Sequence, residues 1–194
     1  MPSLIVFAGP SSIGKTFAAQ ALIQQYPNSC ACAPVHTTRT RRPTETNTSE
    51  RVFVSEESFR QMIQDDAFFV HEEFAGFLYG CSKEQLCPQD KHLIIGVPPL
   101  FLPKFAKQQN VLMVGLQAPP NFETMSEKRM MQRGDSLKVR EARRSFIRRD
   151  IEDLRRLQPL VNRSGKLFRI TDNSTIPTQV LPWIAERLCL AANY

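Results

Sequence analysis

Short apolar runs without polar interruption recur along the chain, at residues 4–8, 92–97 and 111–116. Strands that are buried on both faces of a parallel sheet have this character, because neither face meets water. Residues 166–171 form a weaker run of the same kind and predict a last strand. The apolar runs therefore predict a sheet whose strands are mainly parallel.

Amphipathic segments separate these runs. From residue 15 to 26 the apolar positions recur at helical spacing until Pro27 ends the segment, and residues 100–108 can form a short helix. Strands that alternate with helices are joined by right-handed crossovers, which place helices on both faces of the sheet. The pattern predicts an α/β fold with a doubly wound, mainly parallel sheet.

Two stretches depart from this alternation. Residues 34–90 begin with a loop rich in Thr and Arg and continue with a predicted strand at 52–55 and a predicted helix at 56–64. Residues 121–157 keep apolar residues at helical spacing while arginine crowds the other positions. We expect the first stretch to be a small insert over one end of the sheet and the second to be a helical lid.

The length of 194 residues allows one full hydrophobic core and is too short for two large ordinary domains. We therefore expect a single domain over residues 1–194. Its core would comprise residues 1–33, 91–120 and 158–194, with the insert at about 34–90 and the lid at about 121–157.

Charge and cysteine usage bear on partners and compartment. The formal net charge of +6 suits phosphate-rich ligands and, equally, nucleic acid. Acidic residues interrupt the arginine-rich segment at 140–156, so we expect a phosphate clamp there and no nucleic acid. The five cysteines include no CxxC pair, which indicates a reducing cytoplasm. The N-terminal apolar run is too short for a signal peptide or a membrane span, so a cytoplasmic protein without a membrane contact is expected. The oligomeric state stays open.

A phosphate-binding motif directly follows the first predicted strand. Residues 9–16 (GPSSIGKT) match GxxxxGK[ST], the P-loop or Walker A motif, and stand where a helix begins. Backbone N–H groups of such a loop, together with the helix dipole, cradle nucleotide phosphates. Lys15 would reach the β- and γ-phosphates, and Thr16 would ligate Mg²⁺. The residues predicted to bind ATP with Mg²⁺ are Gly9, Ser11, Ser12, Ile13, Gly14, Lys15 and Thr16.

Three arginines stand within four positions, at Arg39, Arg41 and Arg42. Arginine presents a planar fork of donors that matches phosphate oxygens. A solvated basic loop can have the same composition. The position of the cluster, about two dozen residues after the P-loop, favours a site for the phosphate of an acceptor substrate.

These segments resemble the guanylate kinase family, and the resemblance covers most of the chain. The family's loop reads approximately TTRTPRxGE, where this chain has TTRTRRPTE at 37–45, and GFLYG at 76–80 is similar to the family's GxxYG. FVS at 53–55, the Arg-Gly pair at 133–134 and the Thr-Asp-Asn turn at 171–173 match further. The resemblance implies a P-loop kinase that transfers the γ-phosphoryl group of ATP to a small phosphate-bearing acceptor, which in this family is GMP.

The resemblance also implies roles for three groups of residues. The acceptor phosphate would be held by Arg39, Arg42, Arg51 and Tyr79. The catalytic residues would be Lys15 and the lid arginines Arg133 and Arg144, with Arg143 as the alternative to Arg144. The residues beside the adenine would be Asp172 and Asn173.

The chain departs from the family at the positions that read guanine. When the GxxYG segments are aligned without gaps, Val70 replaces a guanine-binding glutamate. IIGVPP at 94–99 replaces the family's DxDxxG, so a second guanine-reading carboxylate and a Walker-B-like acid are missing. Hydrogen-bonding readout can supply on the order of 10⁴-fold selectivity, so these losses bear directly on the acceptor. Glu72 or Glu73 could substitute if the local strand slips.

Three function classes remain open. The first is a nucleoside monophosphate kinase that acts on GMP. The second is a sugar-phosphate kinase, because the similar ribose 1,5-bisphosphate phosphokinases also lack the glutamate before GxxYG. The third is a non-catalytic guanylate kinase-like module that binds a phosphorylated partner, against which the intact Gly14-Lys15-Thr16 argues.

Overall fold

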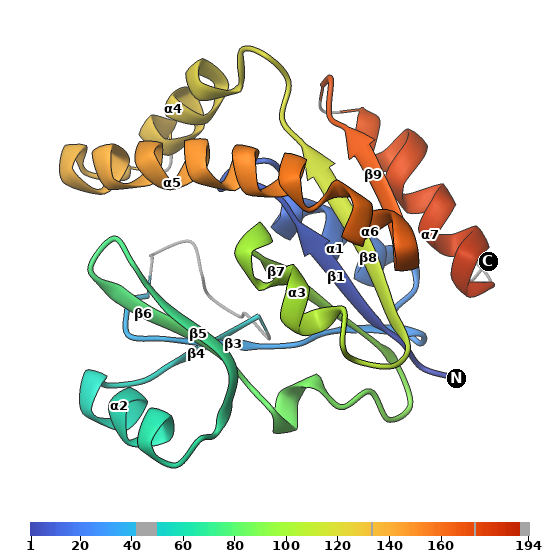
Figure 1. Ribbon diagram of the computed structural model, residues 1–194, viewed down its shortest axis with the longest axis horizontal. Helices are drawn as coiled ribbons and strands as arrows, with labels where there is room; N and C mark the ends of the chain where they lie inside the picture. The colour runs from blue at the N-terminus through green and yellow to red at the C-terminus, as the bar shows by residue number, and fades with distance from the viewer. Residues whose placement is uncertain (42–49, 133, 173, 191–194) are drawn as a thin grey trace.

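The computed structural model describes residues 1–41, 50–132, 134–172 and 174–190 (Figure 1). Its central sheet has five strands in the order β2-β7-β1-β8-β9, and every neighbouring pair is parallel. The strands are β1 (Leu4–Ala8), β2 (Cys30–Cys32), β7 (His92–Val97), β8 (Val111–Gln117) and β9 (Gly165–Arg169). The predicted α/β fold with a mainly parallel sheet is confirmed.

Helices cover both faces of this sheet, because alternate side chains of each buried strand point to opposite faces. In β1, Ile5 and Phe7 join one buried cluster with apolar side chains of α1 (Lys15–Gln25) and α7 (Leu181–Leu188). Leu4, Val6 and Ala8 join a second cluster on the other face. The helices that contribute to this second cluster are α3 (Leu102–Phe105), the end of α5 (Leu137–Arg156) and α6 (Gln158–Ser164).

The predicted insert forms a second sheet of four strands in the order β4-β3-β6-β5. Its elements are β3 (Val35–Thr37), β4 (Arg51–Phe53), α2 (Glu56–Gln64), β5 (Phe68–Phe74) and β6 (Phe77–Ser82). The hydroxyl of Ser55 accepts a hydrogen bond from the backbone N–H of Ser58 at 3.0 Å and caps the start of α2. Phe59, Phe68 and Leu78 form a separate small core between this helix and its sheet.

The predicted lid consists of the helices α4 (Phe122–Gln132) and α5, which contact one another. Ile147 and Leu154 on α5 are buried against the core of the central sheet. The N-terminal half of α5 extends beyond that sheet and lies above the hairpin of β5 and β6 (Figure 1). Phe146 on α5 packs on Phe74 at the end of β5, with ring centroids 4.5 Å apart. The long helix thus connects the core to the insert.

The remaining short elements connect these layers. They are the 3-10 turns η1 (Glu84–Leu86) and η2 (Pro99–Phe101) and the π-helical segment η3 (Ile176–Val180), which leads into α7. Among the described residues, no helix has both the length and the apolar character that a membrane crossing requires.

Candidate functional site

A cavity of about 810 Å³ lies at the edge of the central sheet where its strands end. Its walls come from the P-loop, the end of β7, the insert and the lid. Ligands of open parallel α/β sheets bind at this edge, because the loops after the strands converge there. Side chains that the sequence separates by more than a hundred residues therefore face one cavity.

The backbone of the P-loop adopts conformations that require glycine. Gly14 has φ of 115° at the start of α1, in a region that other residues rarely adopt. A Cβ at Gly14 would also lie 2.8 Å from Cδ1 of Ile176. The predicted loop residues from Ser11 to Thr16 line the cavity, whereas Gly9 does not. A Cβ at Gly9 would lie 2.6 Å from the carbonyl oxygen of Leu116.

Lys15 points back into the loop. Its ammonium donates hydrogen bonds to the carbonyl oxygens of Gly9 and Pro10, at 2.9 Å for Pro10. Burial lowers its pKa from 10.5 to about 8, and the carboxylates of Asp150 and Glu72 oppose that shift. At neutral pH Lys15 therefore carries a positive charge inside the cavity, which suits a polyphosphate.

No acid reaches Lys15 from β7. A Cβ at Gly96 would lie 3.2 Å from Cβ of Lys15, so Gly96 occupies the strand position that faces the lysine. Two carboxylates approach from other elements instead, Asp150 from α5 and Glu72 from β5, and both line the cavity. Sequence reasoning missed Asp150, which had no signal beyond its place in the lid.

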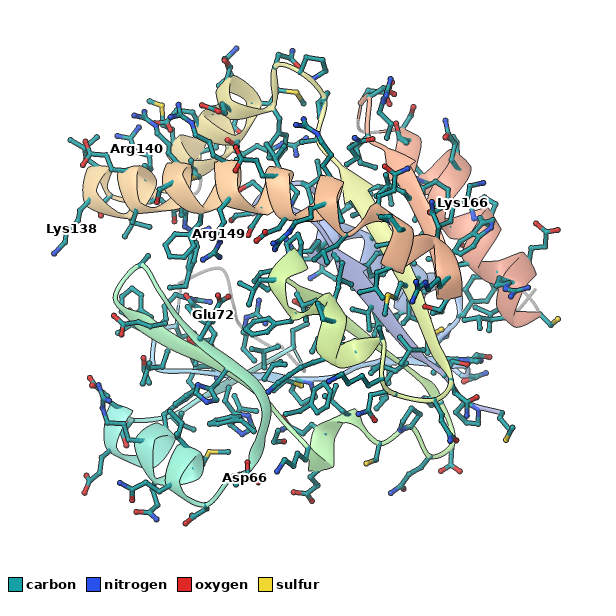
Figure 2. All side chains as sticks on the ribbon, in the orientation of Figure 1. Asp66, Glu72, Lys138, Arg140, Arg149 and Lys166 are labelled. Atoms are coloured by element: carbon teal, nitrogen blue, oxygen red, sulfur yellow. The ribbon has the colours of Figure 1, made fainter. Side chains whose placement is uncertain are left out.

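Arg149 lies between these two carboxylates. Its Nη2 is 3.5 Å from Oδ1 of Asp150 and 3.8 Å from Oε2 of Glu72. Figure 2 shows Arg149 on α5 above Glu72 on the hairpin. Burial raises the pKa of Glu72 to about 7 and that of Asp150 to about 6, although the arginine opposes both shifts. Burial therefore makes the ionised forms of Glu72 and Asp150 less stable than they would be in water.

The sequence predicted Thr16 as a ligand of Mg²⁺. Among the described residues, no group of three or more His, Cys, Asp or Glu side chains could hold a metal ion. Thr16 is exposed in the first turn of α1 and lines the cavity beside Lys15. The hydroxyl of Thr16 and the carboxylate of Asp150 both line the cavity. They fit Mg²⁺, because this ion keeps several waters and takes most of its other ligands from phosphate.

Two lid arginines reach the P-loop. Nη1 of Arg143 donates to Oγ of Ser11 at 3.1 Å, and Nη1 of Arg129 donates to the carbonyl oxygen of Ser12 at 2.7 Å. Both side chains line the cavity. Arg144 lies one residue further along α5, does not line it, and forms an ion pair with Glu127 at 3.1 Å. The geometry therefore favours Arg143 for the role predicted for Arg144.

Arg129 had not been singled out for any role from the sequence, since it is one of many arginines in the lid. The predicted lid arginine Arg133 lies outside the described residues.

The predicted acceptor side faces the same cavity from the insert. Arg39, Arg51 and Tyr79 line it, and Arg42 lies outside the described residues. Val70 lines it as well, so the apolar residue in the place of the family's glutamate faces the cavity in this register.

The predicted adenine side comes from the C-terminal part of the core. Asp172 lines the cavity and accepts hydrogen bonds from the backbone N–H and the hydroxyl of Ser174, at 2.7 and 2.6 Å. Phe17, Ile170 and Ile176 also line the cavity and give it apolar surface. Asn173, predicted for the same role, lies outside the described residues.

Comparison with known proteins agrees with this arrangement. The family model for guanylate kinase matches residues 1–153. A guanylate kinase from Shewanella violacea is 32% identical over 142 residues, which are 70% of this chain and 67% of that protein. A guanylate kinase from Chlamydia muridarum is 29% identical over 63% of this chain, which spans 62% of that relative's length. The human guanylate kinase is 38% identical over 82 residues, 42% of each chain.

The fold has a counterpart among solved structures. The crystal structure of guanylate kinase from Anaplasma phagocytophilum superposes with a TM-score of 0.64 and 16% sequence identity. The superposition covers 97% of this chain and 89% of that one. The likeness therefore concerns the fold and extends over nearly the whole chain.

Proposed function

The chain belongs to the guanylate kinase family, and from that premise we propose that it transfers the γ-phosphoryl group of ATP to a small phosphate-bearing acceptor, with GMP as the first candidate. The observation that supports this most is the position of Lys15. Its charge lies in a P-loop that lines one cavity together with Arg39, Arg51 and Tyr79 of the insert. Phosphate-binding groups from the P-loop and from the insert thus share one cavity.

On the donor side, the backbone N–H groups of the P-loop and Lys15 would hold the β- and γ-phosphates of ATP. Binding requires Lys15 to leave the carbonyl oxygens of Gly9 and Pro10 and turn toward the phosphates. Mg²⁺, when bound with ATP, would neutralise charge on the transferring group. Thr16 would contact that ion, and the turn at Asp172 would lie beside the adenine.

On the acceptor side, Arg39, Arg51 and Tyr79 would fix the phosphate of the acceptor in line with the γ-phosphate. The guanidinium forks match phosphate oxygens. Arg143 and Arg129 would then neutralise the charge that spreads over the transferring group, because both already lie against the P-loop. Such catalysis depends on positioning and electrostatics and needs no covalent enzyme intermediate.

A second candidate acceptor is ribose 1,5-bisphosphate. The observation that favours it is Val70, which faces the cavity where the family's glutamate would bind guanine. An acceptor without a base does not need that glutamate.

A coupled ADP-release assay with ATP and Mg²⁺ distinguishes the two candidates. The acceptors are GMP, AMP, UMP and ribose 1,5-bisphosphate, and Lys15→Ala is the control. We expect Lys15-dependent turnover with GMP above the other acceptors. Turnover with the sugar bisphosphate alone would replace GMP by the second candidate.

A further inference from the structure

Strand β7 carries no acid beside the P-loop. In many P-loop enzymes the Mg²⁺ of the nucleotide is held by the Ser or Thr of the loop and by an acidic residue on a nearby strand. β7 pairs with β1, which leads into the P-loop, and its sequence HLIIGV contains neither Asp nor Glu. Gly96 faces Lys15, and even a Cβ at Gly96 would lie 3.2 Å from Cβ of the lysine. An acid that meets the nucleotide must therefore come from another element.

Acidic residues of the described part of the chain line the cavity at four positions, which are Glu50, Glu72, Asp150 and Asp172. Asp172 is hydrogen-bonded within its own turn, to Ser174 and Thr175. Glu50 and Glu72 belong to the insert. Asp150 lies on α5, and its charge has the largest electrostatic effect on Lys15 of all the charged groups around that lysine. Asp150 is therefore the acid that acts most strongly on the P-loop.

Asp150 lies on the part of α5 that is anchored to the central sheet. Ile147, about one turn earlier, and Leu154, about one turn later, are 1% and 2% exposed and belong to the core. Arg143, about two turns before Asp150 on the same face, donates to Oγ of Ser11 in the P-loop at 3.1 Å. The packing of Ile147 and Leu154 therefore fixes Asp150 in the cavity wall before any ligand binds.

The carboxylate of Asp150 is poorly satisfied by the protein. Its side chain is only 5% exposed, and within the described residues its hydrogen-bond partner is Nη2 of Arg149, at 3.5 Å. This distance is at the limit for a hydrogen bond. The charged groups around Asp150 are Lys15, Arg149, Asp153 and Glu72. Buried carboxylates normally have closer partners, so Asp150 has lone pairs to offer to a ligand in the cavity.

A negative charge at this place would oppose a polyphosphate on its own. Like charges repel strongly in a cavity that excludes water, and Asp150 and the phosphates of ATP would share one cavity with Lys15. A divalent cation between the carboxylate and the phosphates reverses the sign of this interaction. Asp150 is thus compatible with ATP when the nucleotide brings its metal ion.

We propose that Asp150 takes the place of the acid that β7 lacks and, together with Thr16, holds the hydrated Mg²⁺ that accompanies ATP. The chemistry of the two side chains suits this ion, which prefers oxygen ligands and keeps several of its waters. This inference rests on the donor half of the proposed function, the binding of ATP with Mg²⁺. It assigns the metal-holding acid to a helix in place of a strand, so the loss of the acids at 94–99 need not remove the metal site.

Calorimetric titration of the full chain with ATP, without an acceptor, tests this inference. Each protein is titrated once with excess Mg²⁺ and once with EDTA, at about pH 7, where Asp150 and Lys15 are both charged. By linkage, the ratio of the two ATP affinities reports how strongly the protein holds the ion. The wild-type protein should bind ATP more tightly with Mg²⁺. Asp150→Asn should lower the ratio by about 10- to 100-fold, the usual effect of losing a group that supports a metal ion.

The titration with EDTA distinguishes this role from a structural one. Asparagine has nearly the shape of aspartate but does not repel the phosphates, so Asp150→Asn should bind metal-free ATP as tightly as the wild-type protein or more tightly. This arm also shows that the variant is folded. Glu152→Gln removes one negative charge from an exposed position on α5 that does not line the cavity, and it should leave the ratio unchanged.

The possible results separate this inference from the proposed function. If the wild-type protein binds ATP equally with Mg²⁺ and with EDTA, or if Asp150→Asn weakens both titrations by the same factor, the inference is overturned. The inference also fails alone if Asp150→Asn keeps the wild-type ratio while the protein phosphorylates GMP. If the ratio falls as expected but no acceptor receives a phosphoryl group from ATP, the proposed function fails and the inference stands.

Discussion

Replacing Glu72 by Gln should make the ligand-free protein more stable at pH 8. Burial raises the pKa of Glu72 from 4.5 in an unfolded chain to about 7 in the folded protein. The folded protein then binds the proton more tightly than the unfolded chain, so stability falls as pH rises from 4.5 through 7. Glutamine carries no charge at any pH, so the Glu72→Gln variant does not lose this stability as the pH rises.

The size of the effect follows from the same shift. A change of about 2.5 pKa units corresponds to about 3 kcal/mol once the pH is well above 7. The side chain is 16% exposed, and solvent screening reduces the figure to roughly 1–2 kcal/mol. No hydrogen bond to the carboxylate is lost among the described residues, so little offsets this gain. For a chain of this length the melting temperature should rise by about 2–8 °C at pH 8.

Thermal unfolding at pH 4.5 and pH 8, without nucleotide, measures this gain. The wild-type protein, Glu72→Gln and Glu73→Gln are compared, and the exposed Glu73 serves as control because surface changes usually stay within about 0.5 kcal/mol. Glu72→Gln should exceed the wild-type melting temperature only at the higher pH. An equal gain at both pH values, or a loss at pH 8, would refute the argument from buried charge.

Three further predictions concern the P-loop and the lid. Lys15→Ala should lower kcat by at least about 10²-fold and abolish the ATP-induced rise in melting temperature, since the variant loses the charge that meets the phosphates; an unchanged thermal shift with ATP would contradict this role. Arg143→Met should lower kcat by about 10²- to 10³-fold, whereas Arg144→Met, which loses only an exposed pair with Glu127, should stay within about threefold. Steady-state kinetics of the two variants side by side would refute this order if Arg144→Met were the more damaged. Gly14→Ala should cost about 1–3 kcal/mol in urea unfolding, because φ of 115° is strained for alanine and its Cβ meets the side chain of Ile176; a cost below about 0.5 kcal/mol would show that the loop relaxes.

The sequence was sufficient for features that depend on local pattern. Apolar runs identified four of the five strands that the described residues form in the central sheet, because a strand buried on both faces carries few polar residues. The edge strand β2 has only three residues and was not predicted. The helix predicted at 56–64 is found at Glu56–Gln64, where Ser55 caps its start. The P-loop was recognisable because motif, preceding strand and following helix occur together.

The sequence was not sufficient for the side chains that converge from different elements. Arg143 and Arg144 are adjacent in the chain, but one residue turns a helix by about 100°, so only one of them faces the P-loop. The phase of α5 depends on how Ile147 and Leu154 pack against the core. Likewise, the approach of Glu72 to the lid follows from the placement of the insert under α5, which no local pattern encodes.

Transfer of a labelled phosphoryl group tests the central claim most directly. The full chain is incubated with γ-labelled ATP, Mg²⁺ and GMP, and the products are separated to locate the label. The proposed function predicts label in GDP, at a rate that Lys15→Ala abolishes. Label found only in inorganic phosphate, or no release at all with GMP under conditions where ATP binds, would contradict it.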